Sequence, residues 1–191
     1  MGFMKMLAIN GSPRFNGHTA RALDTLLAEG EARGYEVERI DLVDLNYSDC
    51  KGCRSCKTEG FCIINDDMSA LYDKISATDH LILGSPIYMG SETGIFNCFI
   101  DRLYAFLQSK EGGGFDSRLP ADKSATAILV CGSPDGHIIY HYLTNRFTSI
   151  LKGLLGIDDF AAFIIPGTNR LDDVRESVTF KQNIPAFIER L

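Results

Sequence analysis

The sequence predicts a doubly wound α/β domain of three layers, in which helices cover both faces of a five-stranded parallel sheet. Apolar runs of strand length alternate with segments of helical periodicity along most of the chain. The loops expected after three of these runs, at residues 11–18, 85–94 and 131–137, are rich in Gly, Ser and Pro. No internal repeat or linker interrupts the pattern, so residues 1–191 are expected to form a single domain.

The first half of the chain supplies three of the expected strands. Residues 5–10 are a largely apolar run, and the loop after them leads into a segment with leucines at helical spacing. Apolar and polar side chains alternate over residues 35–42, which predicts the second strand. Asp66 or Asp67 can cap the next helix, and the apolar run at residues 80–84 predicts the third strand.

The second half of the chain completes the sheet. Helical spacing over residues 94–107 predicts a helix that stops before the turn-rich segment 112–114. The elements expected next are a strand at 125–130, a helix at 138–154 and a strand at 160–165. Residues 167–191 are expected to form a C-terminal helical extension that Pro185 breaks or kinks, because proline lacks the N–H that a helix interior uses.

Composition and charge argue against several classes of function. The hydrophobic share of 45% and the charged share of 23% are typical of globular domains. No apolar stretch is long enough to cross a bilayer, and the apolar run at residues 4–9 is not followed by a signal-peptide cleavage site. The formal net charge of −6 opposes binding to a phosphate backbone. We therefore expect a cytoplasmic protein that binds neither nucleic acid nor membranes.

The loop at residues 11–18 is the principal candidate for a binding site. Ligands of open α/β sheets bind at the carboxyl ends of the strands, and the free N–H groups at a helix start attract anions. Ser12, Asn16 and Thr19 add neutral donors there, and Arg14 can add a positive charge. The loop suits a phosphate group, although the same polar side chains could instead cap the helix.

Two other nucleotide-binding signatures are not matched by this loop. It is neither GxxxxGK(S/T) nor GxGxxG, the patterns of P-loop and dinucleotide-binding Rossmann proteins. Asp41 could imitate the acid that binds ribose in a Rossmann fold, so that alternative stays open. Pro13 argues against it, because a pyrophosphate needs close approach of the backbone at this point.

Three segments together resemble the NADPH-dependent FMN reductase branch of the flavodoxin-like superfamily: Gly11-Ser-Pro-Arg14, Gly17-His-Thr19 and Ser85-Pro-Ile-Tyr-Met-Gly90. The resemblance covers the chain to about Ile165 and implies a flavodoxin-like fold that binds FMN. It implies that the first loop holds the phosphate, through Ser12, Arg14, Asn16, Gly17, His18 and Thr19. It implies that the second loop lies against the isoalloxazine ring, through Pro86, Ile87, Tyr88, Met89 and Gly90. The third loop would add Gly132 and Ser133.

Two of these residues also have a purely structural interpretation. His18 could simply start the helix and take no part in proton transfer. No residue pattern in the chain marks a proton donor. Tyr88 could be a core residue. Its position in a loop rich in Pro and Gly favours the wall of a ligand pocket.

A segment at residues 49–66 concentrates four of the six cysteines: Cys50, Cys53, Cys56 and Cys62. Repeated C-x₂-C spacing with one further cysteine is the usual ligand pattern of a [4Fe–4S] cluster, and Gly52 and Gly60 allow tight turns around it. A zinc site and a loop of thiols without a metal are the alternatives. The segment resembles that of the iron-sulfur flavoproteins, and this resemblance implies that all four thiolates are ligands. Cys98 and Cys131 are assigned no role.

These features predict an FMN-dependent oxidoreductase that passes electrons between a [4Fe–4S] cluster and FMN. A cluster-free NAD(P)H-dependent FMN or quinone reductase and a passive flavodoxin-like carrier are the alternatives. The expected partners are NAD(P)H, a quinone or a ferredoxin-like protein. The resemblance also implies a homodimer or homotetramer, in which the cluster of one subunit approaches the FMN of another.

Overall fold

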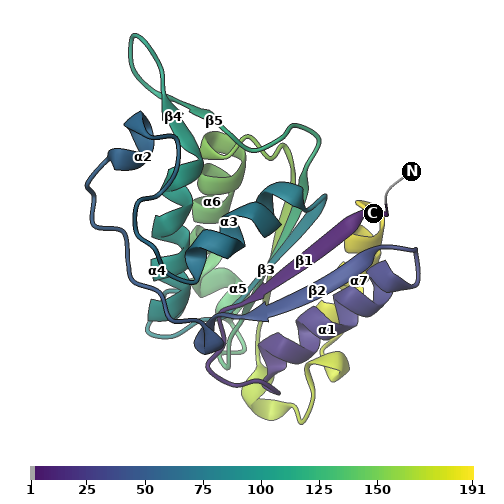
Figure 1. Ribbon diagram of the computed structural model, residues 1–191. Helices are drawn as coiled ribbons and strands as arrows, with labels where there is room; N and C mark the ends of the chain where they lie inside the picture. The colour runs from purple at the N-terminus through teal and green to yellow at the C-terminus, as the bar shows by residue number, and fades with distance from the viewer. Residues whose placement is uncertain (1–2) are drawn as a thin grey trace.

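The computed structural model describes residues 3–191 and confirms the flavodoxin-like doubly wound fold (Figure 1). Its main sheet has five parallel strands in the order β2-β1-β3-β6-β7, the flavodoxin-like arrangement in which the chain reverses direction across the sheet after β1 and β2. The strands are β1 (Lys5–Asn10), β2 (Glu36–Asp41), β3 (His80–Pro86), β6 (Ser124–Val130) and β7 (Asp159–Ile165). Each overlaps a strand that the sequence predicts.

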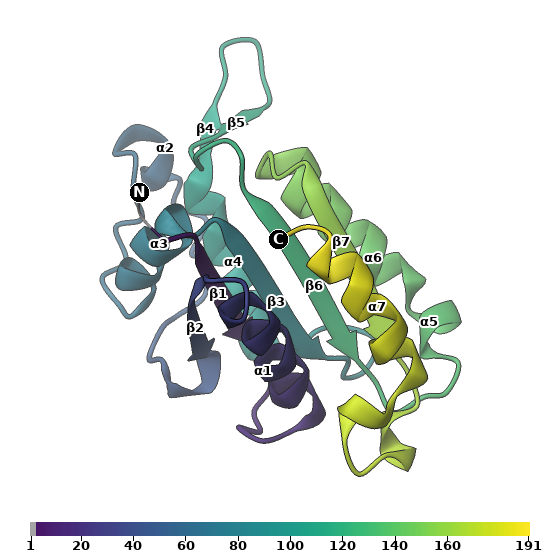
Figure 2. The ribbon, with the colours of Figure 1, turned by 90° about the vertical axis from the view of Figure 1, so that its right-hand side faces the viewer.

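Two layers of helices cover the sheet (Figure 2). α1 (His18–Glu31) and α7 (Val178–Ile188) lie on one face, and α3 (Met68–Ala77), α4 (Gly94–Arg102) and α6 (His141–Thr148) lie on the other. Short elements link them: η1 (Leu42–Asp44), α2 (Ser55–Thr58), η2 (Leu103–Phe106), β4 (Leu107–Ser109), β5 (Phe115–Ser117), α5 (Gly136–Ile139), η3 (Ser149–Leu154), η4 (Thr168–Arg170) and η5 (Val174–Glu176). Within residues 3–191, no helix is both long and apolar enough to span a membrane.

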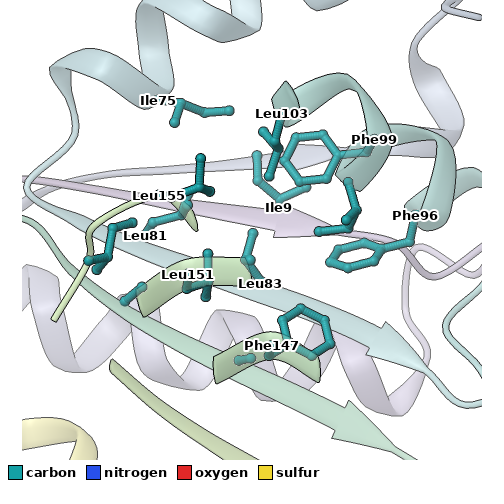
Figure 3. Packing of buried hydrophobic residues seen from close by; sticks show 14 of the residues in the cluster. Ile9, Ile75, Leu81, Leu83, Phe96, Phe99, Leu103, Phe147, Leu151 and Leu155 are labelled. Atoms are coloured by element: carbon teal, nitrogen blue, oxygen red, sulfur yellow. The ribbon is translucent and has the colours of Figure 1, made fainter. Parts of the chain in front are cut away.

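The strands are apolar on both faces because two separate clusters of side chains cover the sheet. On β1, Leu7 and Ile9 pack in the cluster that includes α3, α4 and α6, whereas Met6 and Ala8 pack in the cluster that includes α1 and α7. Figure 3 shows the first cluster, where aromatic rings from α4 and α6 pack against aliphatic side chains of the sheet. Alternation of side chains with a period of two thus produces two cores from one apolar run.

The expected helix over residues 94–107 is wrong at its carboxyl end. α4 stops at Arg102, a single turn η2 follows, and Leu107 then pairs with Ser117 in the antiparallel hairpin β4–β5, which projects from the body of the protein (Figure 1). Beyond α4, the Arg118 guanidinium donates to the carbonyls of Ala105 (2.9 Å) and Leu107 (3.0 Å), which lie where the predicted helix would have continued. These are tertiary contacts, which helical periodicity does not reveal.

Two further boundaries differ from the expectation. The predicted helix over 138–154 is divided into α5, α6 and η3, a six-residue π-helical turn. The C-terminal helix begins only at Val178 and continues through Pro185. The helix continues although Pro185 has no N–H to donate, because Phe180 and Phe187, on either side of the proline, are buried against the sheet. Burial of two such rings offsets a cost of about 3 kcal/mol.

The buried His80 predicts a pH dependence of folding. Its ring lies within 2.6 Å of the Ser124 hydroxyl and 3.1 Å of the Thr126 hydroxyl, and burial, followed by the charge of Arg190, lowers its pKa from 6.5 to about 4. Between pH 6.5 and 4 the unfolded chain binds the proton that the folded chain rejects, so the free energy of unfolding should fall by about 2–3 kcal/mol as the pH falls through this range. Urea titrations of wild type and of His80→Gln should show the flatter pH profile in the variant. Parallel profiles would contradict this assignment.

Candidate functional site

Three loops meet at the carboxyl edge of the sheet, the lower end in Figure 1. Asn10 pairs in register with Gly84 and Pro86 with Val130, so β1, β3 and β6 end side by side. The N–H of Gly11 donates to the carbonyl of Gly84 at 2.7 Å, which joins the first loop directly to β3. The structure therefore brings the three loops named from the sequence to one edge.

The first loop, residues 11–17, is held in place by its own polar groups. The buried amide of Asn10 accepts from the Ser12 N–H (3.1 Å) and donates to Oδ1 of Asp41 (2.5 Å). The Ser12 hydroxyl accepts from the Arg14 N–H at 3.1 Å. These hydrogen bonds fix the loop before any ligand arrives.

The start of α1 lacks an internal cap. Gly17 is the N-cap residue, and no side chain in residues 3–191 hydrogen-bonds to this helix start. Ser12, Asn16 and Thr19 therefore do not act as its cap, contrary to the alternative drawn from the sequence. Nδ1 of His18 is buried and has no partner within the described chain. The first N–H groups of a 14-residue helix thus follow the first loop without a side-chain cap, an arrangement that favours an anion.

Asp41 is already occupied by contacts within the protein. Its Oδ1 accepts from Asn10, and its Oδ2 accepts from Nη2 of Arg39 at 3.0 Å. Arg39 is in turn paired with Asp24 on α1. Asp41 therefore anchors the first loop to β2, and this contact argues against its use as the ribose-binding acid of a Rossmann site.

The second loop ends in a tight turn at its tip. Tyr88 and Ser91 exchange backbone hydrogen bonds of 2.8 and 3.0 Å, and Met89 and Gly90 between them have φ angles of +51° and +83°. Two successive positive φ angles are typical of a type I′ turn. Met89 is fully exposed and Tyr88 is 45% exposed, so Tyr88 is not a core residue.

Helices α4 and α6 hold the second loop in position. The Tyr142 hydroxyl donates to the carbonyl of Gly90, and Arg146 pairs with the buried carboxylate of Glu92 at 2.8 Å. Thr93 caps α4 and donates its hydroxyl to the carbonyl of Gly11 at 2.7 Å. The first two loops therefore form one connected unit.

The C-terminal segment fixes the third loop. The carbonyl of Ser133 accepts from the N–H groups of Gly136 (3.2 Å) and Gly167 (2.9 Å). A Cβ on Gly132 would lie 2.2 Å from Nδ2 of Asn169, so a larger residue there would require the Asn169 side chain to move. Asn169 was not singled out from the sequence, because only the tertiary structure brings residues 167–170 beside this loop.

The four cysteines of segment 49–66 line one small cavity, about 20 Å³ in volume, together with Arg102 and Tyr104. Cys56 is buried, Cys50 and Cys62 are half-buried, and Cys53 is exposed. Gly52 and Gly60 have φ angles of +64° and +86°, as expected of residues that turn the chain around this cavity. Among residues 3–191, no three His, Cys, Asp or Glu side chains are arranged around one point as ligands of a single metal ion.

The cysteine segment and the first loop lie at opposite ends of α4. Gly11 is bonded to Thr93, which caps the helix, whereas the cysteine cavity is lined by Arg102 and Tyr104 at its far end. The nine residues of α4 span about 13 Å of helix. Because the cysteine segment follows the second strand, the sequence predicts that both sites share the carboxyl face of the sheet. This prediction is wrong, because the segment runs back along α4 after it leaves β2 (Figure 1).

The sheet order defines a flavodoxin-like protein, in which the start of α1 at the first loop has no side-chain cap. The chain matches the model of the family described as NADPH-dependent FMN reductase over residues 4–155. It belongs to this family, whose members are flavin-dependent oxidoreductases.

Individual relatives agree with this placement. An iron-sulfur flavoprotein of Archaeoglobus fulgidus is 36% identical over 115 residues, which cover 58% of this chain and 52% of that protein. A second iron-sulfur flavoprotein of Archaeoglobus fulgidus aligns over 97% of this chain and 96% of its own length at 25% identity. The chain thus spans about half the length of the first relative. In fold it is similar to an NAD(P)H:quinone oxidoreductase from Methanothermobacter marburgensis, with a TM-score of 0.72 at 14% identity over 98% of this chain and 97% of that one.

The close contact between the first loop and α4 predicts an asymmetry between two glycines. A Cβ on Gly11 would lie 2.4 Å from Cδ2 of Phe96 on α4. A Cβ on Gly94, which is also on α4, would meet nothing within 4 Å. Gly11→Ala should therefore lower the free energy of unfolding by about 1–3 kcal/mol. Gly94→Ala should leave it within about 1 kcal/mol of wild type. Urea denaturation monitored by circular dichroism measures both, and equal midpoints would refute the packing argument.

Proposed function

We propose that this protein is an FMN-dependent oxidoreductase that passes electrons between FMN at the three loops and a [4Fe–4S] cluster at the cysteine segment. The observation that carries the proposal is the gathering of four thiols around one cavity in a chain of the FMN reductase family. Iron-sulfur flavoproteins among its relatives support the same combination.

The first loop suits the phosphate of FMN. The uncapped N–H groups of α1 and the Thr19 hydroxyl are the candidate donors, and the exposed Arg14 adds a positive charge. Ser12 shapes the loop through its hydroxyl, which donates to the carbonyl of Arg14 and accepts from its N–H. The unpaired Nδ1 of His18 is a further donor when it carries the ring proton. In this proposal Asn16 and Gly17 complete the loop. A single terminal phosphate fits such a short loop at one helix start.

The second and third loops suit the isoalloxazine ring. The turn at Tyr88, Met89 and Gly90 presents an exposed aromatic and an exposed thioether side chain beside the sheet edge. Pro86 and Ile87 lead into this turn, and Gly132 and Ser133 lie in the loop that follows the neighbouring strand β6. When bound, FMN supplies hydride acceptance and single-electron exchange. The role of the chain is to bind and orient the ring and to limit water on the side that it covers.

The cysteine cavity suits a cluster by its donor set. A cubane binds each thiolate to a different iron, so its ligands surround a volume, as Cys50, Cys53, Cys56 and Cys62 do here. Because the cavity measures about 20 Å³, uptake of a cluster requires the segment to widen. The exposed Cys53 and the open space around Gly52 and Gly60 leave room for the solvent side of the segment to move.

The distance between the two sites favours electron exchange between subunits. Because α4 separates them within one chain, the proposal includes a homodimer or homotetramer in which the cysteine segment of one subunit lies near the FMN of another. Three exposed apolar side chains lie near the carboxyl edge of the sheet and offer a contact surface: Met89, Ile138 and Ile139. NAD(P)H, a quinone or a ferredoxin-like protein would be the external donor or acceptor.

Arg14→Gln tests the phosphate site. Loss of one charge-assisted hydrogen bond should weaken FMN binding about tenfold, or ~1.4 kcal/mol, and leave riboflavin binding unchanged because riboflavin has no phosphate. Arg33→Gln, near the other end of α1, is the matched control and should bind both flavins as wild type does. Titration of the apoprotein by flavin fluorescence gives both constants. A similar loss for FMN and riboflavin would exclude a phosphate contact of Arg14.

Cys56→Ala tests the cluster site. The variant should lose most iron and acid-labile sulfide but keep FMN, because the cysteine segment and the flavin loops share no residue. Cys98→Ala, a half-buried thiol on α4 outside the cavity, should keep both groups. Iron and sulfide per FMN are measured after anaerobic reconstitution. If wild type itself takes up neither, the protein is a cluster-free flavin reductase.

A further inference from the structure

Arg102 is a buried positive charge at the last residue of α4. Its side chain is 1% exposed, yet its guanidinium has a partner for every nitrogen. Nη1 and Nη2 donate to the two carboxylate oxygens of Asp66 at 2.7 and 3.0 Å, and Nε donates to the Tyr72 hydroxyl at 3.2 Å. Nη1 also donates to the carbonyl of Ser48 at 2.8 Å. A buried ion pair with this many hydrogen bonds depends on both partners being present.

The partners of Arg102 are the two ends of the cysteine segment. Ser48 precedes the first cysteine, Cys50, and Asp66 follows the last, Cys62. Asp66 also accepts from the Ser48 N–H at 3.1 Å, so the segment is closed at its base like an Ω-loop. Burial opposes ionisation of Asp66, but the hydrogen bond and charge of Arg102, together with the backbone hydrogen bonds from Ser48 and Met68, outweigh it and hold the pKa of Asp66 below its usual range. Arg102 therefore ties α4 to both stems of the loop.

The cavity between these stems is rich in positive charge. Arg102, Lys51 and Arg54 all line it, whereas no Asp or Glu does. Lys57, in the middle of the segment, donates to the carbonyls of Tyr104 and Leu107 and lies 3.6 Å from the centre of the Tyr104 ring. The whole chain carries a net charge of −6, so this concentration of cations is local. It complements an anionic occupant.

We propose that Arg102 is a positioning residue of the cysteine site, which closes the base of the loop and places a buried positive charge beside the group that the four thiolates hold. The proposal rests on the function proposed above. A [4Fe–4S] cluster with four thiolate ligands is an anion and becomes more negative on reduction. A neighbouring guanidinium stabilises the reduced form more than the oxidised form and raises the reduction potential.

Two substitutions of the pair should shift this potential in opposite directions. Arg102→Gln removes the positive charge and should make the cluster potential more negative. Asp66→Asn leaves the positive charge unpaired beside the cavity and should make the potential more positive. A role in folding alone predicts loss of cluster in both variants and no such opposition. The potentials are measured by redox titration of the cluster signal in electron paramagnetic resonance of the anaerobically reconstituted holoprotein.

Exposed cations supply a second test if the buried variants do not fold. Lys51→Gln and Arg54→Gln leave the Arg102–Asp66 pair intact and should each shift the potential to more negative values. Lys181→Gln, an exposed charge on α7, should leave it unchanged. Tyr72→Phe removes the hydroxyl that accepts from Nε of Arg102 and donates to its carbonyl, and it should increase amide hydrogen exchange in residues 48–66 relative to wild type.

The outcomes separate the two proposals. Wild type without iron and sulfide overturns the proposed function, and the role of Arg102 with it. Wild type with a cluster whose potential is the same in every variant that folds overturns the charge role of Arg102 and leaves the proposed function in place. Unchanged hydrogen exchange in Tyr72→Phe counts against the closure of the loop by this residue network.

Discussion

The packing of α4 against the end of β1 is the constraint on which both candidate sites depend. Gly11 has no side chain, so Phe96 can lie over the first loop, and Thr93 can reach the carbonyl of Gly11 at 2.7 Å. Phe96 and Phe99 are fully buried, which fixes the rotation of the helix about its axis. With that rotation fixed, Arg102 at the other end of α4 points into the cysteine segment rather than to solvent.

Hydrogen bonds within the protein fix the polar groups of the first loop at the carboxyl edge of the sheet. Asn10, Asp41 and Ser12 satisfy one another in the first loop, whereas the start of α1 has no cap within the described residues. Leaving helix N–H groups without a protein partner costs stability unless water or an anion binds them. A phosphate that occupies this position recovers that cost, and the fixed loop loses little entropy on binding. In the proposed function, hydrogen bonds among Asn10, Asp41 and Ser12 thus preorganise the first loop for the phosphate.

Charge is distributed unevenly in this acidic chain. Acidic side chains predominate overall, but Arg14 stands at the flavin edge and Lys51, Arg54 and Arg102 border the cysteine cavity. Both locations suit anionic groups, a phosphate in one case and a thiolate-bound cluster in the other. The length of α4 separates the two candidate sites within a subunit. The proposed electron path therefore includes the assembly of subunits.

Hydrophobic periodicity by itself determined the five strands, their parallel arrangement and the loops at their carboxyl ends, because burial on both faces of a sheet leaves a continuous apolar pattern. The resemblance of short loop motifs, together with cysteine spacing, singled out the residues of both candidate sites. The sequence did not reveal where α4 ends or that the cysteine segment runs away from the flavin edge. Arg118 and Lys57 donate hydrogen bonds to backbone carbonyls beyond α4, and Arg102 forms an ion pair with Asp66. Those contacts join residues 11 to 50 positions apart, and only the packed tertiary structure brings such residues together.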